Sequence, residues 1–214
     1  RVLFPYFFGL EGLLQDGVSF LKIDKVMERF GWPMGPSYLL DVIGIDTAVH
    51  ASQIMADSYP DRMKRTGNSA IELLFKEGRH GQKNRKGFYS YTNDKKGKLK
   101  KIIDSAVEIN LESIVKKNKT VSDEEIIERM MFPMIIESAR ALQEKIVDTP
   151  MEVDLGVIYG LGFPPFRGGV LKYADTYGLK EICEKSKRYT EHLGACYQPN
   201  ALLLDLSKKN KTFY

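Results

Sequence analysis

A tyrosine and an arginine in one short stretch have the clearest chemical potential in this 214-residue sequence. Tyr159 and Arg167 both lie in the stretch 154–169, which reads DLGVIYGLGFPPFRGG. Its five glycines allow positive φ and close backbone approach, and its two adjacent prolines each fix φ. The composition predicts a rigid turn. From such a turn a phenol could hydrogen-bond a ligand, and a guanidinium could pair with a phosphate or carboxylate.

Both side chains also have structural interpretations. A tyrosine beside glycines is often a packed aromatic residue whose hydroxyl meets a carbonyl. An arginine in a turn often donates to the turn carbonyls instead of to a ligand. For Tyr159 and for Arg167 the residues alone leave these alternatives open.

The three histidines have no catalytic partner at a useful spacing. We expect His50, in an apolar helical run, to be hydrogen-bonded within its helix, and His192 to complement a helix end. His80 lies among glycines and lysines in the stretch 78–91, where a phosphate cradle is one interpretation. A loop packed back on the first helices is favoured, because no strand-to-helix phosphate-loop pattern surrounds it. We assign no catalytic residue and no metal ligand.

Composition sets broad limits on the class of protein. The chain is 43% hydrophobic and 28% charged with a net charge of +4, which is ordinary for a globular protein. So mild a charge does not call for nucleic acid, although it suits a small anionic ligand. Cys183 and Cys196 have no metal spacing and predict free thiols in a reducing cytosol. The chain starts at Arg1 directly in apolar sequence, and we expect it to be a fragment of a larger protein.

Helical periodicity dominates the elements that position these residues. Apolar spacing and caps predict helices over 2–16, 23–30, 39–55, 69–75, 102–115, 122–146, 151–159, 170–177, 179–193 and 200–207. We expect a kink at Pro133, well inside one of them. The stretch 78–91 predicts a loop with an aromatic, strand-like tip, and 92–101, TNDKKGKLKK, predicts a solvated linker. Period-2 alternation is nearly absent, so the predicted fold class is all-α.

The chain also repeats itself at an offset that drifts from 128 to 134 residues. The matched landmarks keep their order: RVLFP (1–5) with RMMFP (129–133), LQD (14–16) with LQE (142–144), GWP (31–33) with GFP (162–164), and Asp41 and Gly44 with Asp175 and Gly178. Two similar helical units packed about a pseudo-twofold axis follow from this pattern. We predict a first repeat over 1–92, a linker with a helix over 93–121 and a second repeat over 122–214.

The large apolar side chains of the repeat have a core interpretation. The matched positions of Trp32 and Phe163 predict core anchors for the two turns. We expect flexible core side chains at Met130, Met131 and Met134, although the wall of an apolar binding site is an alternative.

Three motifs carry a resemblance to a known family. GWPMGPSYLLDVIGID (31–46), GRHGQKNRKGFYSY (78–91) and YGLGFPPFRGG (159–169) resemble the C-terminal helical domains of the 3-hydroxyacyl-CoA dehydrogenase family. The presence of two copies resembles its multifunctional members. The resemblance implies two tandem repeats of the 6-phosphogluconate dehydrogenase C-terminal-like type.

The resemblance also implies a function in fatty acid β-oxidation. Members oxidise 3-hydroxyacyl-CoA to 3-oxoacyl-CoA with NAD, which a separate Rossmann domain binds beside a catalytic His–Glu pair. A substrate-contacting Asn would fall immediately before Arg1, and no GxGxxG fingerprint occurs here. The chain alone is therefore expected to lack cofactor-binding residues and activity. One substrate contact of the family maps inside the chain, at Tyr159.

The implied partners are acyl-CoA, the protein's own NAD-binding and enoyl-CoA hydratase/isomerase domains, and a thiolase β subunit. The implied location is cytoplasmic, and neither nucleic acid nor a membrane is indicated. A different class of function stays open, namely a non-catalytic helical module that mediates oligomerisation only.

Overall fold

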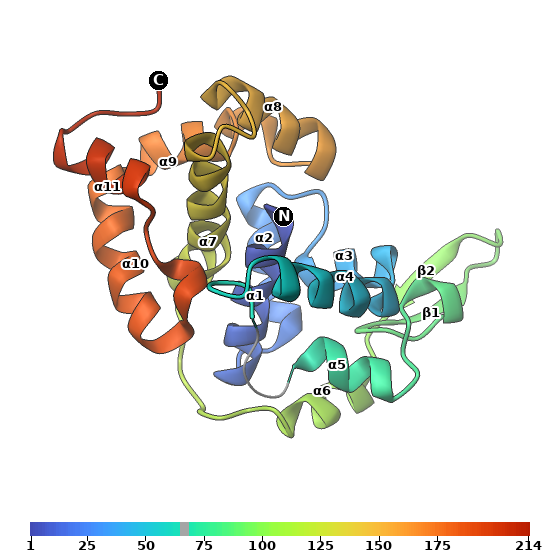
Figure 1. The fold of residues 1–214 in the computed structure, drawn as a ribbon. Helices are drawn as coiled ribbons and strands as arrows, with labels where there is room; N and C mark the ends of the chain where they lie inside the picture. Colours follow the sequence, from blue (N-terminus) through green and yellow to red (C-terminus); the bar gives the residue numbers. More distant parts are fainter. Residues whose placement is uncertain (65–68) are drawn as a thin grey trace.

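The computed structural model describes residues 1–64 and 69–214, which are mostly helical (Figure 1). The first unit contains α1 (Leu3–Gln15), α2 (Phe20–Phe30), α3 (Pro36–Ile43), α4 (Ile45–Ser58), α5 (Ala70–Lys76), the 3-10 turn η1 (Gln82–Asn84) and β1 (Ser90–Asn93), and it is followed by β2 (Leu99–Ile102) and α6 (Ser105–Glu112). The second contains α7 (Asp123–Gln143), α8 (Pro150–Leu161), η2 (Pro165–Arg167), α9 (Val170–Tyr177), α10 (Leu179–Leu193), η3 (Ala195–Tyr197) and α11 (Ala201–Lys208). Within these ranges no helix has the length and apolar character that a membrane span requires.

The series α1–α4 recurs as α7–α10, and the first helices of the two series pack against each other at the centre of the molecule. Gly9 of α1 permits this approach, because a Cβ there would lie 2.4 Å from the carbonyl oxygen of Arg129 on α7. The predicted pairing of two helical units within one chain is confirmed.

Reciprocal ion pairs mark the relationship between the units. Arg1 Nη1 lies 2.8 Å from the Glu144 carboxylate, and Arg129 Nη1 lies 2.8 Å from that of Asp16. Since the repeat matches Arg1 with Arg129 and Asp16 with Glu144, each unit supplies the same two positions to the other. An isologous contact of this kind is what a twofold axis generates between identical subunits.

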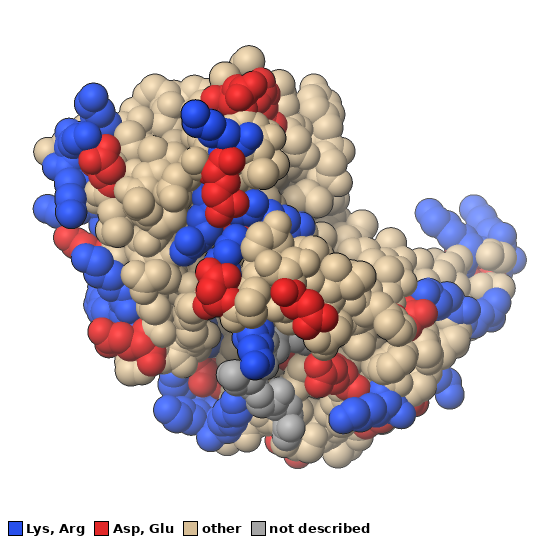
Figure 2. All heavy atoms as spheres, viewed as in Figure 1, with Lys and Arg blue, Asp and Glu red and all other residues tan. Residues whose placement is uncertain are grey.

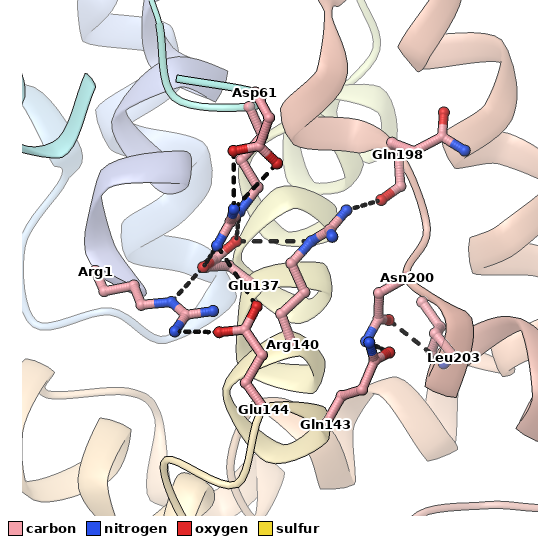
Figure 3. Close-up of polar contacts among 10 residues, drawn as sticks. Arg1, Asp61, Glu137, Arg140, Gln143, Glu144, Gln198, Asn200 and Leu203 are labelled. Atoms are coloured by element: carbon pink, nitrogen blue, oxygen red, sulfur yellow. Dashed lines mark hydrogen bonds and ion pairs between the residues drawn. The ribbon is translucent and has the colours of Figure 1, made fainter. Parts of the chain in front are cut away.

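A denser cluster surrounds the Arg1 end of this interface (Figure 3). Arg1 and Arg62 of the first unit both donate to the buried Glu137 carboxylate of α7, at 2.9 Å for Arg62 Nε. Arg140, one turn along α7, donates to the backbone carbonyl of Gln198 at 2.9 Å. A buried carboxylate is tolerated here because two guanidinium groups pair with it.

A buried aspartate joins the second helix of each series to the third. Asp24 of α2 accepts from the backbone N–H groups of Ser37 and Tyr38, at 2.8 and 3.1 Å, in the first turn of α3. Asp154 of α8 accepts from two backbone N–H groups in the first turn of α9, at 2.7 and 3.0 Å. Each carboxylate thus satisfies donors that a helix start leaves unpaired.

A second pair of aspartates extends this arrangement to the end of each unit. Asp41 accepts from the backbone N–H groups of 88–89 at 2.8 and 2.9 Å, and Asp175 accepts from those of 213–214 at 2.9 and 3.1 Å. Both segments read Phe-Tyr. The tyrosine hydroxyl then donates to the capping aspartate of its own unit, at 2.9 Å in the first and 2.8 Å in the second. The repeat therefore includes the last residues of the chain.

Two expectations from the sequence are wrong. The run 39–55 is not one helix, because Gly44 adopts φ of 100° and separates α3 from α4. The stretch 92–101 is not a simple linker, because β2 pairs antiparallel with β1, with Tyr91 opposite Lys101. The boundaries at 92 and 122 stay predictions.

Pro133 lies inside α7, as expected, and the predicted kink there stays a prediction. Proline has no N–H, so the carbonyl of Arg129, four residues earlier, loses its helical donor. The hydroxyl of Tyr197 donates to this carbonyl oxygen at 2.7 Å. A buried side chain from a distant segment thus repairs the hydrogen-bond ladder.

Candidate functional site

The candidate site is the outer face of α8, and local sequence fixes where this helix starts and stops. Thr149 and Glu152 form a capping box, with Pro150 at the first helical position. Gly162 ends the helix with φ of 77°. Burial raises the pKa of Asp154, which holds α8 on α9.

Tyr159 points away from the protein. Its side chain is 85% exposed, and its phenol makes no hydrogen bond with any residue in the described ranges. The packed-aromatic interpretation of Tyr159 is therefore wrong for this structure. A phenol held outward on a rigid helix is available to donate to, or accept from, a bound molecule.

Further apolar side chains accompany Tyr159. Met151 and Leu155 precede it at intervals of four residues and lie on the same side of α8, at 57% and 44% exposure. Phe166, in the turn that follows, is 75% exposed. We call these four residues the α8 face. Exposed apolar side chains scattered singly are common, whereas three on one side of a helix and a fourth in the turn that follows are a candidate for a binding surface.

The inner side of the same turn is a structural anchor. Phe163 is fully buried and packs edge-to-face on Trp32, with ring centroids 5.5 Å apart. Arg167 Nε donates to the carbonyl of Phe30 at 2.9 Å, and its guanidinium lies 3.9 Å from the centroid of that ring. The core prediction for Trp32 and Phe163 is confirmed, and Arg167 has the structural role that was one of its two interpretations.

The first unit does not reproduce the α8 face. Since Asp24 and Asp154 occupy equivalent places, Lys25 and Arg29 stand where the second unit has Leu155 and Tyr159. Arg29 is exposed and donates to Asp123 at 2.9 Å. The shared scaffold thus carries a charged outer face in one copy and an apolar one in the other, so the apolar character is not required by the fold.

The remaining candidates have structural surroundings. His50 Nδ1 lies 2.7 Å from the backbone carbonyl of Asp46, and His80 Nδ1 lies 3.9 Å from its carboxylate. The hydrogen bond from Lys83 lowers the pKa of Asp46. The loop 78–91 therefore packs back on α4, as favoured from the sequence. Met130, Met131 and Met134 are buried core, as expected.

A cavity of about 700 Å³ lies elsewhere, between α1, the stretch 116–119 and the stretch 190–196. It includes His192 but not Tyr159. Its lining is mainly polar, and Lys116 and Lys119 donate to Gln15 and Asp16 at the end of α1, at 2.9 and 3.1 Å. Among the described residues, no group of three or more His, Cys, Asp or Glu is placed to hold a metal.

Sequence reasoning missed the exposed apolar residues that share one side of α8 with Tyr159. The spacing of Met151, Leu155 and Tyr159 was the available signal, because apolar residues four apart share one helical face. It was obscured by Val153 and Val157, which form the buried side of the same helix.

Comparison with known proteins places the chain in a family. The profile of the family described as "3-hydroxyacyl-CoA dehydrogenase, C-terminal domain" matches residues 1–91 and again 126–212. The fatty acid oxidation complex subunit alpha of Pseudomonas syringae pv. tomato is 53% identical over all 214 residues, and that of Pseudomonas putida strain F1 is 50% identical. The chain spans 30% of the length of each of these relatives.

Two solved structures share the fold. One, 3-hydroxybutyryl-CoA dehydrogenase from Escherichia coli, has a TM-score of 0.74 at 18% identity over 98% of this chain and 59% of its own. The other, the dehydrogenase part of multifunctional enzyme 1 from C. elegans, has a TM-score of 0.68 at 20% identity over 96% of this chain and 46% of its own. With two matches to the family's C-terminal domain, over residues 1–91 and 126–212, this chain belongs to the 3-hydroxyacyl-CoA dehydrogenase family.

Proposed function

We propose that this chain is the substrate-side and assembly region of an NAD-dependent enzyme that oxidises 3-hydroxyacyl-CoA to 3-oxoacyl-CoA in fatty acid β-oxidation. The observation that carries the proposal is the α8 face, where an unpaired phenol stands on an apolar surface and the equivalent positions of α2 hold Lys25 and Arg29. The names of the curated relatives support the pathway.

In this proposal the α8 face covers the acyl-CoA. Met151, Leu155 and Phe166 exclude water from the acyl chain, and the Tyr159 hydroxyl hydrogen-bonds a polar group of the thioester substrate. The buried contacts of Phe163 and Asp154 keep the face rigid, so little order is lost when substrate binds.

NAD would be held by protein outside these residues. The described residues form helices and one antiparallel hairpin, and they offer no parallel βα unit of the kind that cradles a dinucleotide. NAD would accept the hydride, and the residues that transfer the proton would belong to the NAD-binding domain. The chain alone is accordingly proposed to be inactive, and to work in the cytoplasm with its own NAD-binding and hydratase domains and a thiolase subunit.

A chimeric subunit tests the proposal. This chain would replace the matching 214 residues of the Pseudomonas syringae relative, and NADH formation from 3-hydroxyacyl-CoA would be measured. We expect turnover by the chimera and none by the chain alone. A folded, assembled but inactive chimera would support an oligomerisation module instead, and turnover by the chain alone would refute the proposed division of labour.

A further inference from the structure

The β1–β2 hairpin projects from the helical body (Figure 1). The turn at its tip is held by hydrogen bonds. Asp94 Oδ1 accepts from the backbone N–H groups of Lys96 and Lys98, at 2.8 and 2.9 Å, and the N–H of Gly97 donates to the Asp94 carbonyl at 2.9 Å. The turn is therefore ordered by the one carboxylate of the segment, whose oxygen is occupied by the backbone.

The hairpin concentrates positive charge. Its residues 94–101, DKKGKLKK, contain five lysines and one aspartate, so they hold as much net charge, +4, as the whole chain. Lys95, Lys96, Lys98 and Lys100 are exposed and make no ion pair with any residue that the structure describes. In Figure 2 blue side chains gather on this projection, whereas blue and red alternate over the body.

The fifth lysine ties the hairpin to the body. Lys101 Nζ lies 4.3 and 4.7 Å from the ring centroids of Tyr38 and Tyr89, and 3.7 Å from the Glu28 carboxylate. Because these contacts hold the base of β2, the free lysines are presented together at a fixed place.

Aliphatic side chains of the hairpin lie near the free lysines in the sequence, one between Lys98 and Lys100 and two after Lys101. Leu99, Ile102 and Ile103 are 39%, 46% and 61% exposed. Side chains this exposed gain free energy on insertion into the boundary between lipid headgroups and acyl chains.

We propose that the β1–β2 hairpin docks this protein on an anionic lipid bilayer. Lysine clusters with exposed aliphatic residues suit anionic headgroups over an apolar layer. Protein interfaces favour Arg and aromatic residues and are depleted in Lys, and binding of single-stranded nucleic acid uses aromatic stacking. Residues 94–103 contain neither Arg nor an aromatic residue. The proposal is independent of the function proposed above.

Vesicle sedimentation tests the proposal with phosphatidylcholine vesicles that contain or lack phosphatidylglycerol. We expect binding only with the anionic lipid, and release at high salt. The double variant Lys98→Gln/Lys100→Gln should bind about 25-fold more weakly, roughly fivefold for each lysine. The variant Lys180→Gln/Lys187→Gln, which removes two exposed lysines of α10, should bind as the unchanged chain does.

Ile103→Ser separates lipid insertion from general attraction to polyanions. It should weaken binding to anionic vesicles and leave binding to heparin unchanged. Equal losses in both double variants, absence of binding to anionic vesicles, or tighter binding to a single-stranded oligonucleotide or an acidic peptide than to vesicles would overturn the proposal.

Discussion

Asp24 and Asp154 make the same contacts in the two units. Each buried carboxylate caps the next helix, and each accepts a hydrogen bond from the hydroxyl of a tyrosine near the end of its unit. The glycine before each capped helix lies against the carboxylate-bearing side chain. A Cβ would lie 2.3 Å from Asp24 Cβ at Gly35, and 2.2 Å from Asp154 Cβ at Gly169. The duplicated element is thus the connection between two consecutive helices, α2 with α3 and α8 with α9, and this joint requires Asp and Gly together.

Gly35→Ala tests this joint without backbone strain, because Gly35 has φ of −68°. We expect a loss of about 1–3 kcal/mol in the free energy of unfolding, measured by urea titration, since the methyl group must displace Asp24. Gly156→Ala is the matched control. It lies in α8 with nothing within 4 Å of the new Cβ, so we expect a gain of about 0.5–1 kcal/mol. Similar effects of the two changes would contradict this account of the joint.

Tyr197→Phe removes the hydroxyl that serves the Arg129 carbonyl. The unsatisfied buried acceptor should cost about 1–3 kcal/mol of unfolding free energy. Pro133→Ala restores an N–H four residues after Arg129, so the tyrosine change should cost less in that background. A double-mutant cycle measures this coupling. Additive effects would mean that Tyr197 does not compensate for the proline.

The reciprocal ion pairs of the two units differ in burial, which predicts unequal effects. Asp16→Asn leaves the Arg129 guanidinium, 1% exposed, without its main carboxylate, and we expect a loss of about 3–5 kcal/mol. Glu144→Gln changes the equivalent position, where the carboxylate is 41% exposed, and should cost less than about 1 kcal/mol. Thermal unfolding of both variants tests the difference, and a larger loss for Glu144→Gln would be inconsistent with it.

Asp41 predicts a specific pH dependence. Burial raises the pKa of its carboxyl from 3.8 to about 6. The folded chain therefore binds more protons than the unfolded chain between these values, and the contribution of Asp41 to stability is lost as pH rises through about 6. Relative to Asp41→Asn, the unchanged chain should lose about 3 kcal/mol between pH 3 and pH 7. Urea titrations of both proteins across this range measure the difference, and an increase with pH would show the opposite shift.

Much of the scaffold could be predicted from the sequence. The helices 170–177 and 179–193 have the predicted bounds, because Gly169, Gly178 and Gly194 stop each apolar period where it ends. The landmarks RVLFP and RMMFP correctly indicated two units. Apolar periodicity carries this information because it is local and repeated.

What the sequence did not reveal depends on long-range contacts or on exposure. The hairpin was missed because its second strand reads LKKI, which has no alternation, and pairs through its backbone. The break at Gly44 was missed because apolar residues continue on both sides. The four aspartate contacts bridge residues up to 65 positions apart. Matched Asp positions in the two copies were the one signal that could have indicated them.

The kinetic effect of Tyr159 in the chimeric subunit tests the central claim most directly. Tyr159→Ala should lower kcat/KM for a long-chain 3-hydroxyacyl-CoA by at least about tenfold, because about 1.5–3 kcal/mol of contact is lost, and Tyr159→Phe by about fivefold. Arg29→Ala, the equivalent position of the first unit, should leave kcat/KM unchanged. Unaltered kcat and KM in Tyr159→Ala, with the fold intact, would remove the α8 face from the substrate site.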